Sequence, residues 1–246
     1  MNNCPLCSSN KVRKISVLTG SRTGEKHPLY ACHSCFTLFQ KSTYHEDEKA
    51  LKRDLQWHIN WKEQYNDLHT KKIIEKLLEF DPTAKTMLDI GCGIGSSLLA
   101  GNKLGLICSG VEPNPFACKY AKQHYNFDFV EDYFHPEHFP NNFDIVILDQ
   151  VLEHVPNPQQ FIKDVFSVVK PSGLLYLGVP GNRGGIVRVL FSLLFQQHRM
   201  SIFNDNDVHI NHFFHRGILH LCHSNNAKVV YKMRPGDYII QKSAID

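Results

Sequence analysis

The chain has 246 residues, of which 42% are hydrophobic and 21% charged, as in an ordinary globular protein of one domain plus an appendage. Its 27 basic and 24 acidic side chains give a net charge of +3, which is too mild to indicate a nucleic-acid-binding protein by itself. We see no secretory leader and no apolar run long enough to span a bilayer. We therefore expect a cytoplasmic protein without a transmembrane segment.

Two C-x-x-C pairs lie close to the N-terminus, and the other four cysteines are scattered singly. The paired residues are Cys4, Cys7, Cys32 and Cys35. Two such turns aim four thiolates at one point, as tetrahedral zinc requires. The segment between the pairs has the pattern of two short strands joined by a Gly-Ser turn, so residues 1–43 are predicted to form a zinc ribbon. A redox dithiol is the alternative, and His27 and His33 are further possible ligands.

A zinc ribbon can bind nucleic acid, contact a partner or brace a substrate pocket. This segment lacks a dense Lys/Arg face with interleaved aromatic residues, so we favour a bracing or substrate-contact role. Residues 44–80 are then predicted to form a connecting helix and a helix that packs on the main sheet, because apolar residues recur there at helical spacing. Asp81-Pro82 ends that second helix.

Strand and helix patterns alternate through the rest of the chain. The predicted strands are 86–90, 106–111, 127–130, 143–149, 174–179, 228–233 and 238–241. The predicted helices between them are 96–103, 115–124, 158–169 and 214–224. This alternation predicts an α/β fold with a parallel sheet between layers of helices, and an antiparallel hairpin at the end.

A glycine-rich loop follows the first strand of this region, in the sequence LDIGCGIG. Its glycines are Gly91, Gly93 and Gly95, so the third comes one residue earlier than in the dinucleotide-binding pattern G-x-G-x-x-G. Asp89 stands just before the loop and would repel a phosphate, but it would suit a cation or an amine. S-adenosylmethionine carries both a sulfonium and an amino group.

Two more acidic residues follow the next strands. Glu112, in the sequence GVEPNP, stands where a carboxylate accepts hydrogen bonds from both hydroxyls of a ribose. Asp132 follows the third strand and could meet an adenine amine. The ordered set of Asp89, the glycines, Glu112, Asp132 and FDIVILDQVLEHV is far more specific than the glycines alone.

These motifs resemble those of class I S-adenosylmethionine-dependent methyltransferases. LDIGCGIG is similar to the first motif of that family, VEPNP to its ribose-binding motif, and FDIVILDQVLEHVPNP to the fourth-strand motif of a subgroup that includes quinone-biosynthesis and sugar methyltransferases. The resemblance implies a Rossmann-like, mostly parallel sheet of seven strands with a reversed last strand, and a catalytic domain over residues 81–246. An N-terminal ribbon is similar to that of some bacterial sugar and small-molecule methyltransferases.

The resemblance also implies which residues bind the cofactor. They are Asp89, Gly91, Gly93, Gly95, Glu112, Pro113, Asp132, Asp149 and Gln150. The expected cofactors are S-adenosylmethionine and zinc. Cys92, inside the loop, is expected to be a packing residue, since nothing near it in the sequence would depress its pKa.

Three histidines are candidates for a general base that takes a proton from the acceptor. His209 and His212 lie in the segment HINHFFH after the fifth strand, and His154 lies in LEHV after the fourth. His154 could equally be a structural residue, and the spacing within HINHFFH also allows a metal site.

Residues 181–208 are predicted to be an insertion that contains an apolar helix with basic ends, around 186–199. This helix could shape an acceptor pocket, simply cover the core, or lie on a membrane surface.

The expected function is methyl transfer from S-adenosylmethionine to a small-molecule or sugar-type acceptor. One alternative is an RNA or protein methyltransferase that grips its substrate with the ribbon, and another is a non-catalytic module that binds S-adenosylmethionine. The sequence after the fourth strand is Asp149-Gln150-Val151-Leu152, without the Asn/Asp-Pro-Pro-aromatic motif of many nucleobase methyltransferases, which argues against a nucleic-acid acceptor. The sequence predicts neither the acceptor nor the oligomeric state.

Overall fold

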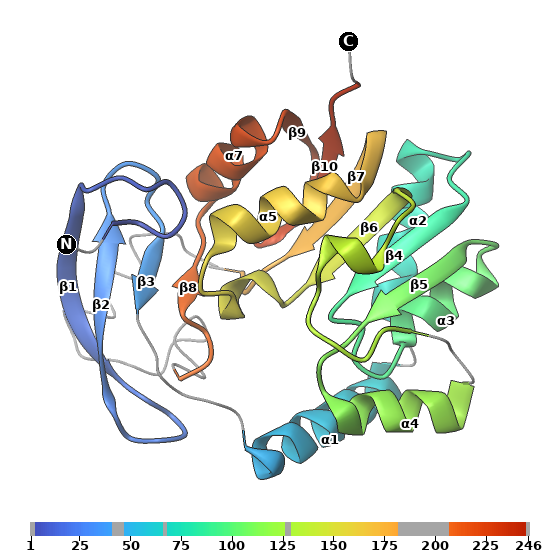
Figure 1. Cartoon of the computed structure of the whole chain (residues 1–246), viewed down its shortest axis with the longest axis horizontal. Helices are drawn as coiled ribbons and strands as arrows, with labels where there is room; N and C mark the ends of the chain where they lie inside the picture. Colours follow the sequence, from blue (N-terminus) through green and yellow to red (C-terminus); the bar gives the residue numbers. More distant parts are fainter. Residues whose placement is uncertain (1–2, 41–46, 66–67, 126–128, 182–206, 245–246) are drawn as a thin grey trace. The chain divides into compact units, whose positions relative to one another are not determined.

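The computed structural model describes residues 3–40, 47–65, 68–125, 129–181 and 207–244 (Figure 1). The chain forms two compact units, and neither is continuous in sequence. Unit 1 comprises Met1–Tyr44, Gln150–Lys163 and Leu177–Ile240, and unit 2 comprises His45–Asp149, Asp164–Tyr176 and Gln241–Asp246. The predicted insertion, with its apolar helix, lies almost wholly outside the described residues. Among the helices that the structure describes, none is long and apolar enough to cross a membrane.

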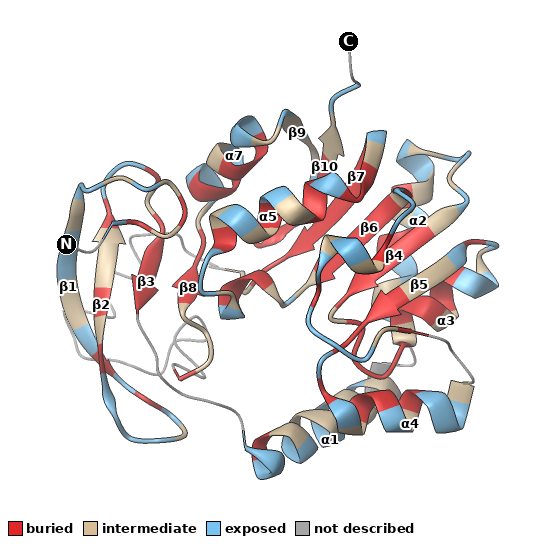
Figure 2. Ribbon diagram, viewed as in Figure 1, coloured by how far each residue is buried: buried red, intermediate tan, exposed pale blue. Residues whose placement is uncertain are grey.

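Unit 2 begins with the two predicted helices, α1 (Glu48–Tyr65) and α2 (Leu68–Phe80). The alternating elements follow: β4 (Thr86–Ile90), α3 (Ser96–Lys103), β5 (Ile107–Val111), α4 (Pro115–Tyr125), the short 3₁₀ helix η1 (Pro136–His138) and β6 (Phe143–Asp149). β4 pairs in parallel with β5 on one side and with β6 on the other. The strands β4 and β6 are buried along most of their length (Figure 2), as expected of parallel strands covered by helices on both faces.

The whole α/β sheet has the strand order β5-β4-β6-β7-β10-β9. The added strands are β7 (Val169–Gly178), β9 (Ala227–Arg234) and β10 (Asp237–Lys242). β9 and β10 are neighbours joined by Pro235-Gly236, which confirms the predicted hairpin. Gly236 has a φ of 99°, and a Cβ there would lie 2.2 Å from the carbonyl oxygen of Val179, so only glycine fits this turn.

Two details of the sheet differ from the sequence prediction. Among the described residues the sheet has six strands. The expected strand 127–130 falls mostly outside them, and Val130 makes a parallel bridge to Val111. β7 begins at Val169 rather than at residue 174. Pro171 lies within this strand, and the next residue, Ser172, has a φ of 63°.

Unit 1 contains a second sheet, with the order β1-β2-β3-β8. Its strands are β1 (Val12–Thr19), β2 (Lys26–Cys32), β3 (Leu38–Gln40) and β8 (Asn211–His212). β1 and β2 form the antiparallel hairpin predicted for the ribbon, and Leu18, Leu29 and Leu38 pack together as its small core. β8 comes from far along the chain and pairs with β3, so the ribbon sheet is completed by a strand that the sequence did not predict.

Unit 1 also holds the 3₁₀ helix η2 (Leu152–His154), the start of α5 (Pro158–Ser167), and α7 (His215–Ser224). α7 approaches the ribbon closely, since a Cβ at Gly217 would lie 2.9 Å from Thr37 Oγ1 and 3.2 Å from Leu6 Cδ2. Glycine at this position lets the helix and the ribbon meet without a gap.

A buried carboxylate fastens the ribbon hairpin to the segment that leads into β8. Asp207 accepts hydrogen bonds from the backbone N–H of Arg22 at 2.6 Å, from Thr23 Oγ1 at 2.6 Å and from His27 Nε2 at 3.1 Å. Burial alone would raise the pKa of Asp207, but these hydrogen bonds hold it below its ordinary value. His27, considered above as a metal ligand, is thus engaged with Asp207.

Candidate active site and metal centre

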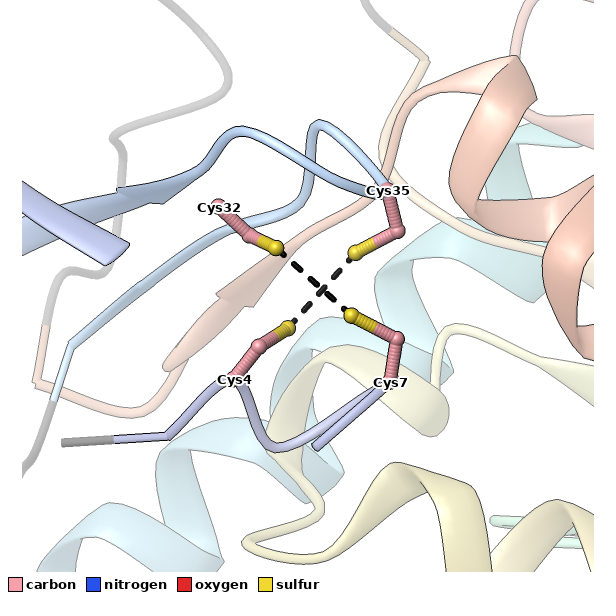
Figure 3. Close-up of side chains that lie close together, drawn as sticks. All are labelled: Cys4, Cys7, Cys32 and Cys35. Atoms are coloured by element: carbon pink, nitrogen blue, oxygen red, sulfur yellow. Dashed lines mark hydrogen bonds between the residues drawn. The ribbon is translucent and has the colours of Figure 1, made fainter. Parts of the chain in front are cut away.

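The four cysteines of the two C-x-x-C pairs converge in unit 1 (Figure 3). Cys4 Sγ lies 3.6 Å from Cys35 Sγ, and Cys7 Sγ lies 3.6 Å from Cys32 Sγ. All four sulfurs lie within 4.8 Å of one another. A tetrahedral zinc ion with Zn–S bonds of about 2.3 Å would hold its ligand sulfurs about 3.8 Å apart, so the cluster has the dimensions of a four-thiolate zinc site.

The thiols of this cluster share protons through sulfur–sulfur hydrogen bonds. The hydrogen bond from Cys4 lowers the pKa of Cys35 to about 4, whereas burial raises the pKa of Cys7 to about 11. Four thiolates cannot crowd together at neutral pH without a cation to neutralise them. A metal bound here would therefore displace protons from the cluster.

The glycine-rich loop of unit 2 joins β4 to α3. Gly91, Gly93 and Gly95 have φ values of 78°, 54° and 83°, a conformation that side chains with a Cβ seldom adopt. Gly95 is the N-cap of α3, and its N–H donates to the carbonyl oxygen of Cys92 at 2.9 Å, which makes the loop a tight turn.

The N–H groups of this loop point into the protein. Gly91 and Cys92 donate to the carbonyl oxygen of Val111 at 2.8 and 3.2 Å, and Gly93 donates to Glu112 Oε2 at 2.8 Å. In a dinucleotide site the corresponding donors and a helix N-terminus face a pyrophosphate. Here these donors are already used, so the loop is unsuited to cradle phosphates.

Asp89 lies at the end of β4 and is 5% exposed. Its Oδ2 accepts a hydrogen bond from Ser97 Oγ in the first turn of α3. Burial raises the pKa of Asp89 to about 7, the hydrogen bond from Ser97 opposes that shift, and the charges of Asp149 and Glu112 add to it. Ser97 was missed from the sequence, although it follows the glycine loop by two residues.

Glu112 is the first residue after β5 and is 8% exposed. Besides the bond to Gly93, its Oε1 accepts the N–H of Asn114 at 2.8 Å, across the intervening Pro113. Each carboxylate oxygen has a second lone pair. The side chain is thus held in a defined orientation by two backbone donors.

The remaining predicted cofactor residues are more exposed. Asp132 Oδ1 accepts the N–H of Tyr133 at 2.7 Å, and its Oδ2 lies 3.7 Å from His138 Nε2. Asp149 is the last residue of β6. Gln150 follows with a φ of 56°, uncommon for a residue with a side chain, and its N–H donates to the carbonyl oxygen of Gly178 at 2.9 Å.

A cavity of about 310 Å³ also lies in unit 2. Its lining residues are Ser109, Gly110, Phe129, Val130, His138, Phe139, Pro140, Asn141 and Phe143. None of the predicted cofactor residues lines it, so this cavity is distinct from the glycine loop and its acidic residues. Cys92 is buried and its pKa is raised well above the ordinary thiol value, mainly by burial, which agrees with a packing role.

All three candidate histidines lie in unit 1, and two of them are in contact. The rings of His154 and His209 meet edge to face, with centroids 4.8 Å apart, and His154 Nδ1 lies 3.2 Å from the carbonyl oxygen of Val208. His154 is exposed, His209 is partly exposed, and His212 in β8 is buried. Ile210 N–H donates to the carbonyl oxygen of Glu153 at 2.9 Å, which ties η2 to this segment.

A second group of possible metal ligands lies at the same place. Glu153, His154 and His209 offer ligand atoms that lie within 4.8 Å of one another. The metal alternative predicted for the HINHFFH segment placed all its ligands within that segment, whereas this group draws two ligands from η2.

The raised pKa of Asp89 implies that the free energy of unfolding depends on pH. The unfolded chain releases this proton near pH 3.8 and the folded chain near pH 7, so the free energy of unfolding falls as pH rises from about 4 to 7. At one pKa unit per 1.36 kcal/mol, the loss is roughly 4 kcal/mol at most. We expect Asp89→Asn, without cofactor, to raise the thermal midpoint relative to wild type at pH 8 by clearly more than at pH 5.

The control for this experiment is Glu137→Gln, which changes an exposed carboxylate of η1 and should not alter the pH dependence. A difference between Asp89→Asn and wild type that is the same at pH 5 and pH 8 would show that Asp89 stays ionised in the folded protein.

Comparison with known proteins relates the chain to enzymes. Residues 61–232 match the model of a methyltransferase-domain family. The mitochondrial ubiquinone biosynthesis O-methyltransferase of Schizosaccharomyces pombe is 36% identical over 103 residues, which cover 39% of this chain and 38% of that protein. The ubiquinone biosynthesis O-methyltransferase of Glaesserella parasuis is 38% identical over 106 residues, covering 38% and 44%. The matches thus span about two fifths of each relative.

Solved structures share the fold at low sequence identity. An O-methyltransferase family protein from Burkholderia thailandensis has a TM-score of 0.61 at 16% identity, covering 82% of this chain and 62% of that one. CalS10, an amino pentose methyltransferase from Micromonospora echinaspora solved with S-adenosylmethionine bound, has a TM-score of 0.56 at 11% identity, covering 81% and 100%. Since the family model matches most of the chain, the chain belongs to the methyltransferase-domain family and is a class I S-adenosylmethionine-dependent methyltransferase by sequence and fold.

Proposed function

We propose that this protein transfers a methyl group from S-adenosylmethionine to a hydroxyl of a small-molecule or sugar-type acceptor. The observation that carries the proposal is the glycine loop, whose N–H donors are turned inward while Asp89 and Glu112 stand beside it. Such a loop repels phosphates and suits a ligand with a cationic centre and a ribose. The names of the curated relatives support an oxygen atom of a small molecule as the methyl acceptor.

The cofactor would be held by residues of unit 2. Glu112, fixed by the N–H groups of Gly93 and Asn114, would accept the ribose hydroxyls. Asp132 would accept the adenine amine, and Asp89 and Asp149 would lie near the cationic end. When bound, S-adenosylmethionine supplies a methyl group on a positively charged sulfur, open to in-line attack. Aligning the acceptor with that methyl group is worth about 7 to 11 kcal/mol at best.

A hydroxyl acceptor also needs a base. We favour His209 over His212, because His209 keeps exposed surface whereas His212 is 7% exposed within β8. His154, whose ring packs against that of His209, would orient it or share the proton. An imidazole titrates near neutral pH, so it can accept a proton there without a large shift.

We also propose that the cysteine cluster holds zinc and that the ribbon braces the acceptor side. The dimensions of the cluster support the metal, and the pairing of β3 with β8 supports the brace, since β8 follows His209 by two residues. The hydrophobic core of the ribbon is too small to be stable without a bound metal ion.

The activity is tested with S-adenosylmethionine labelled in its methyl group, offered with phenols and catechols, with nucleotide sugars, and with RNA. We expect label on a hydroxyl of a small molecule. With the identified acceptor, His209→Ala should lower turnover by roughly a hundredfold while leaving the affinity for S-adenosylhomocysteine unchanged. His223→Ala, an exposed histidine of α7, should change neither.

Transfer to RNA alone would favour the alternative in which the ribbon grips nucleic acid. Cofactor binding without transfer to any acceptor class would favour a non-catalytic module. Full turnover by His209→Ala would move the base to His154 or His212, or show that none is needed.

The metal is tested by elemental analysis of protein purified without chelators. We expect about one zinc per chain, and its loss in Cys32→Ser, because three thiolates leave the tetrahedral site incomplete. Cys108→Ser, a partly buried cysteine of β5 outside the cluster, should keep the metal. Equal zinc in Cys32→Ser and wild type would refute the four-cysteine site.

A further inference from the structure

Helix α1 places a histidine directly against the glycine loop, within unit 2. The ring atoms Cε1, Nδ1 and Nε2 of His58 lie 3.2 to 3.4 Å from the position that a Cβ on Gly93 would occupy. Neither the motifs of the loop nor the comparisons assign a role to this residue. The short distance means that the ring of His58 packs against the loop at Gly93.

Several contacts fix α1 in this position. Asn114 Nδ2 donates to the carbonyl oxygen of Leu51 at 3.0 Å, Lys52 lies over the ring of Phe116, and Lys62 bonds to the hydroxyl of Tyr125. Figure 1 shows α1 running alongside α4. The turn after β5, which carries Glu112, and the helix that carries His58 are thus tied together, so His58 has a defined place relative to the loop.

The charges around the loop leave one part of the proposed cofactor without a partner. S-adenosylmethionine has a sulfonium, an α-amino group and ribose hydroxyls, which suit the carboxylates of Asp89, Glu112 and Asp149. Its α-carboxylate is an anion that those carboxylates would repel. The loop N–H groups of Gly91, Cys92, Gly93 and Gly95 are all donated within the protein, so they cannot bind it. A basic side chain from another element is therefore a suitable partner for the α-carboxylate.

We propose that His58 binds the α-carboxylate of S-adenosylmethionine through a ring N–H, an inference that rests on the proposed function. His58 is a basic side chain that borders Gly93, and it comes from a helix rather than from the acidic edge. Burial lowers the pKa of His58, and Asp54 on the same helix opposes that shift. The ring can donate a hydrogen bond in either protonation state. α1, which precedes the alternating strands and helices in the chain, would thus complete the cofactor site.

The test compares two ligands that differ at the amino-acid end. S-adenosylhomocysteine carries the α-carboxylate, whereas 5′-methylthioadenosine has the same adenosine and thioether but no amino-acid group. We expect calorimetry to show that His58→Ala binds S-adenosylhomocysteine about 10- to 100-fold more weakly, the effect of losing one hydrogen bond to a charged group, and binds 5′-methylthioadenosine as wild type does. His58→Gln retains an N–H donor and should recover part of the affinity.

Asn60→Ala, an exposed substitution on the same helix, is the control and should bind both ligands normally. If His58→Ala weakens both ligands equally, His58 only supports the loop, and the proposal fails. It fails as well if S-adenosylhomocysteine binds His58→Ala and wild type equally. If the wild-type protein binds neither ligand, the assignment of S-adenosylmethionine as cofactor fails, and the proposal for His58 fails as well.

Discussion

The hydrogen bond from the Gly93 N–H to Glu112 Oε2 is the interaction on which the account of the cofactor site depends. It turns a loop donor inward, away from any ligand, and at the same time fixes the carboxylate that would receive the ribose. The left-handed backbone of the three glycines makes this turn possible within a loop one residue shorter than that of a dinucleotide site. The same turn thus has two effects. It removes N–H donors that a pyrophosphate would need, and it fixes the carboxylate of Glu112 in place.

The second constraint lies in unit 1, where the sheet of the ribbon includes a strand from a distant part of the chain. Its sheet accepts β8 as a fourth strand, and its hairpin is fastened by Asp207, two residues before His209. The main-chain bond from Ile210 to Glu153 then links the same segment to η2. Zinc bound by the cysteine cluster would therefore stabilise a sheet that includes the chain around the candidate histidines. Such stabilisation is the role that we propose for the ribbon.

Much of the fold and of the metal centre could be predicted from the sequence, because the patterns that indicate them lie within short segments of the chain. The bounds of β4 and β6 follow from apolar runs such as FDIVILD, which are buried on both faces, and the cysteine cluster follows from the spacing of two turns. The helical spacing of apolar residues predicted α2, in which Ile73, Ile74 and Leu77 are buried, although Leu68 at its start is exposed. The site residues of the loop remain predictions about binding, although their geometry agrees with the roles proposed for them.

What could not be predicted depends on contacts between distant segments. β8 has only two residues and no periodic pattern, so its pairing with β3 leaves no trace in the sequence. The hydrogen bonds of Asp207 join residues 180 to 185 positions apart. His58 lies on a mostly polar helix whose apolar residues follow no clean stripe, and only the packing of α1 brings it to Gly93. In each case the fold, and not the spacing of residues along the sequence, brings the partners together.

The central claim is that the inward-turned loop selects S-adenosylmethionine over a dinucleotide. It is tested most directly by calorimetric titration of the wild-type chain, in parallel, with S-adenosylhomocysteine and with reduced nicotinamide adenine dinucleotide. The account predicts saturable binding of one S-adenosylhomocysteine per chain and no measurable binding of the dinucleotide. Tight binding of the dinucleotide, with none of S-adenosylhomocysteine, would contradict it.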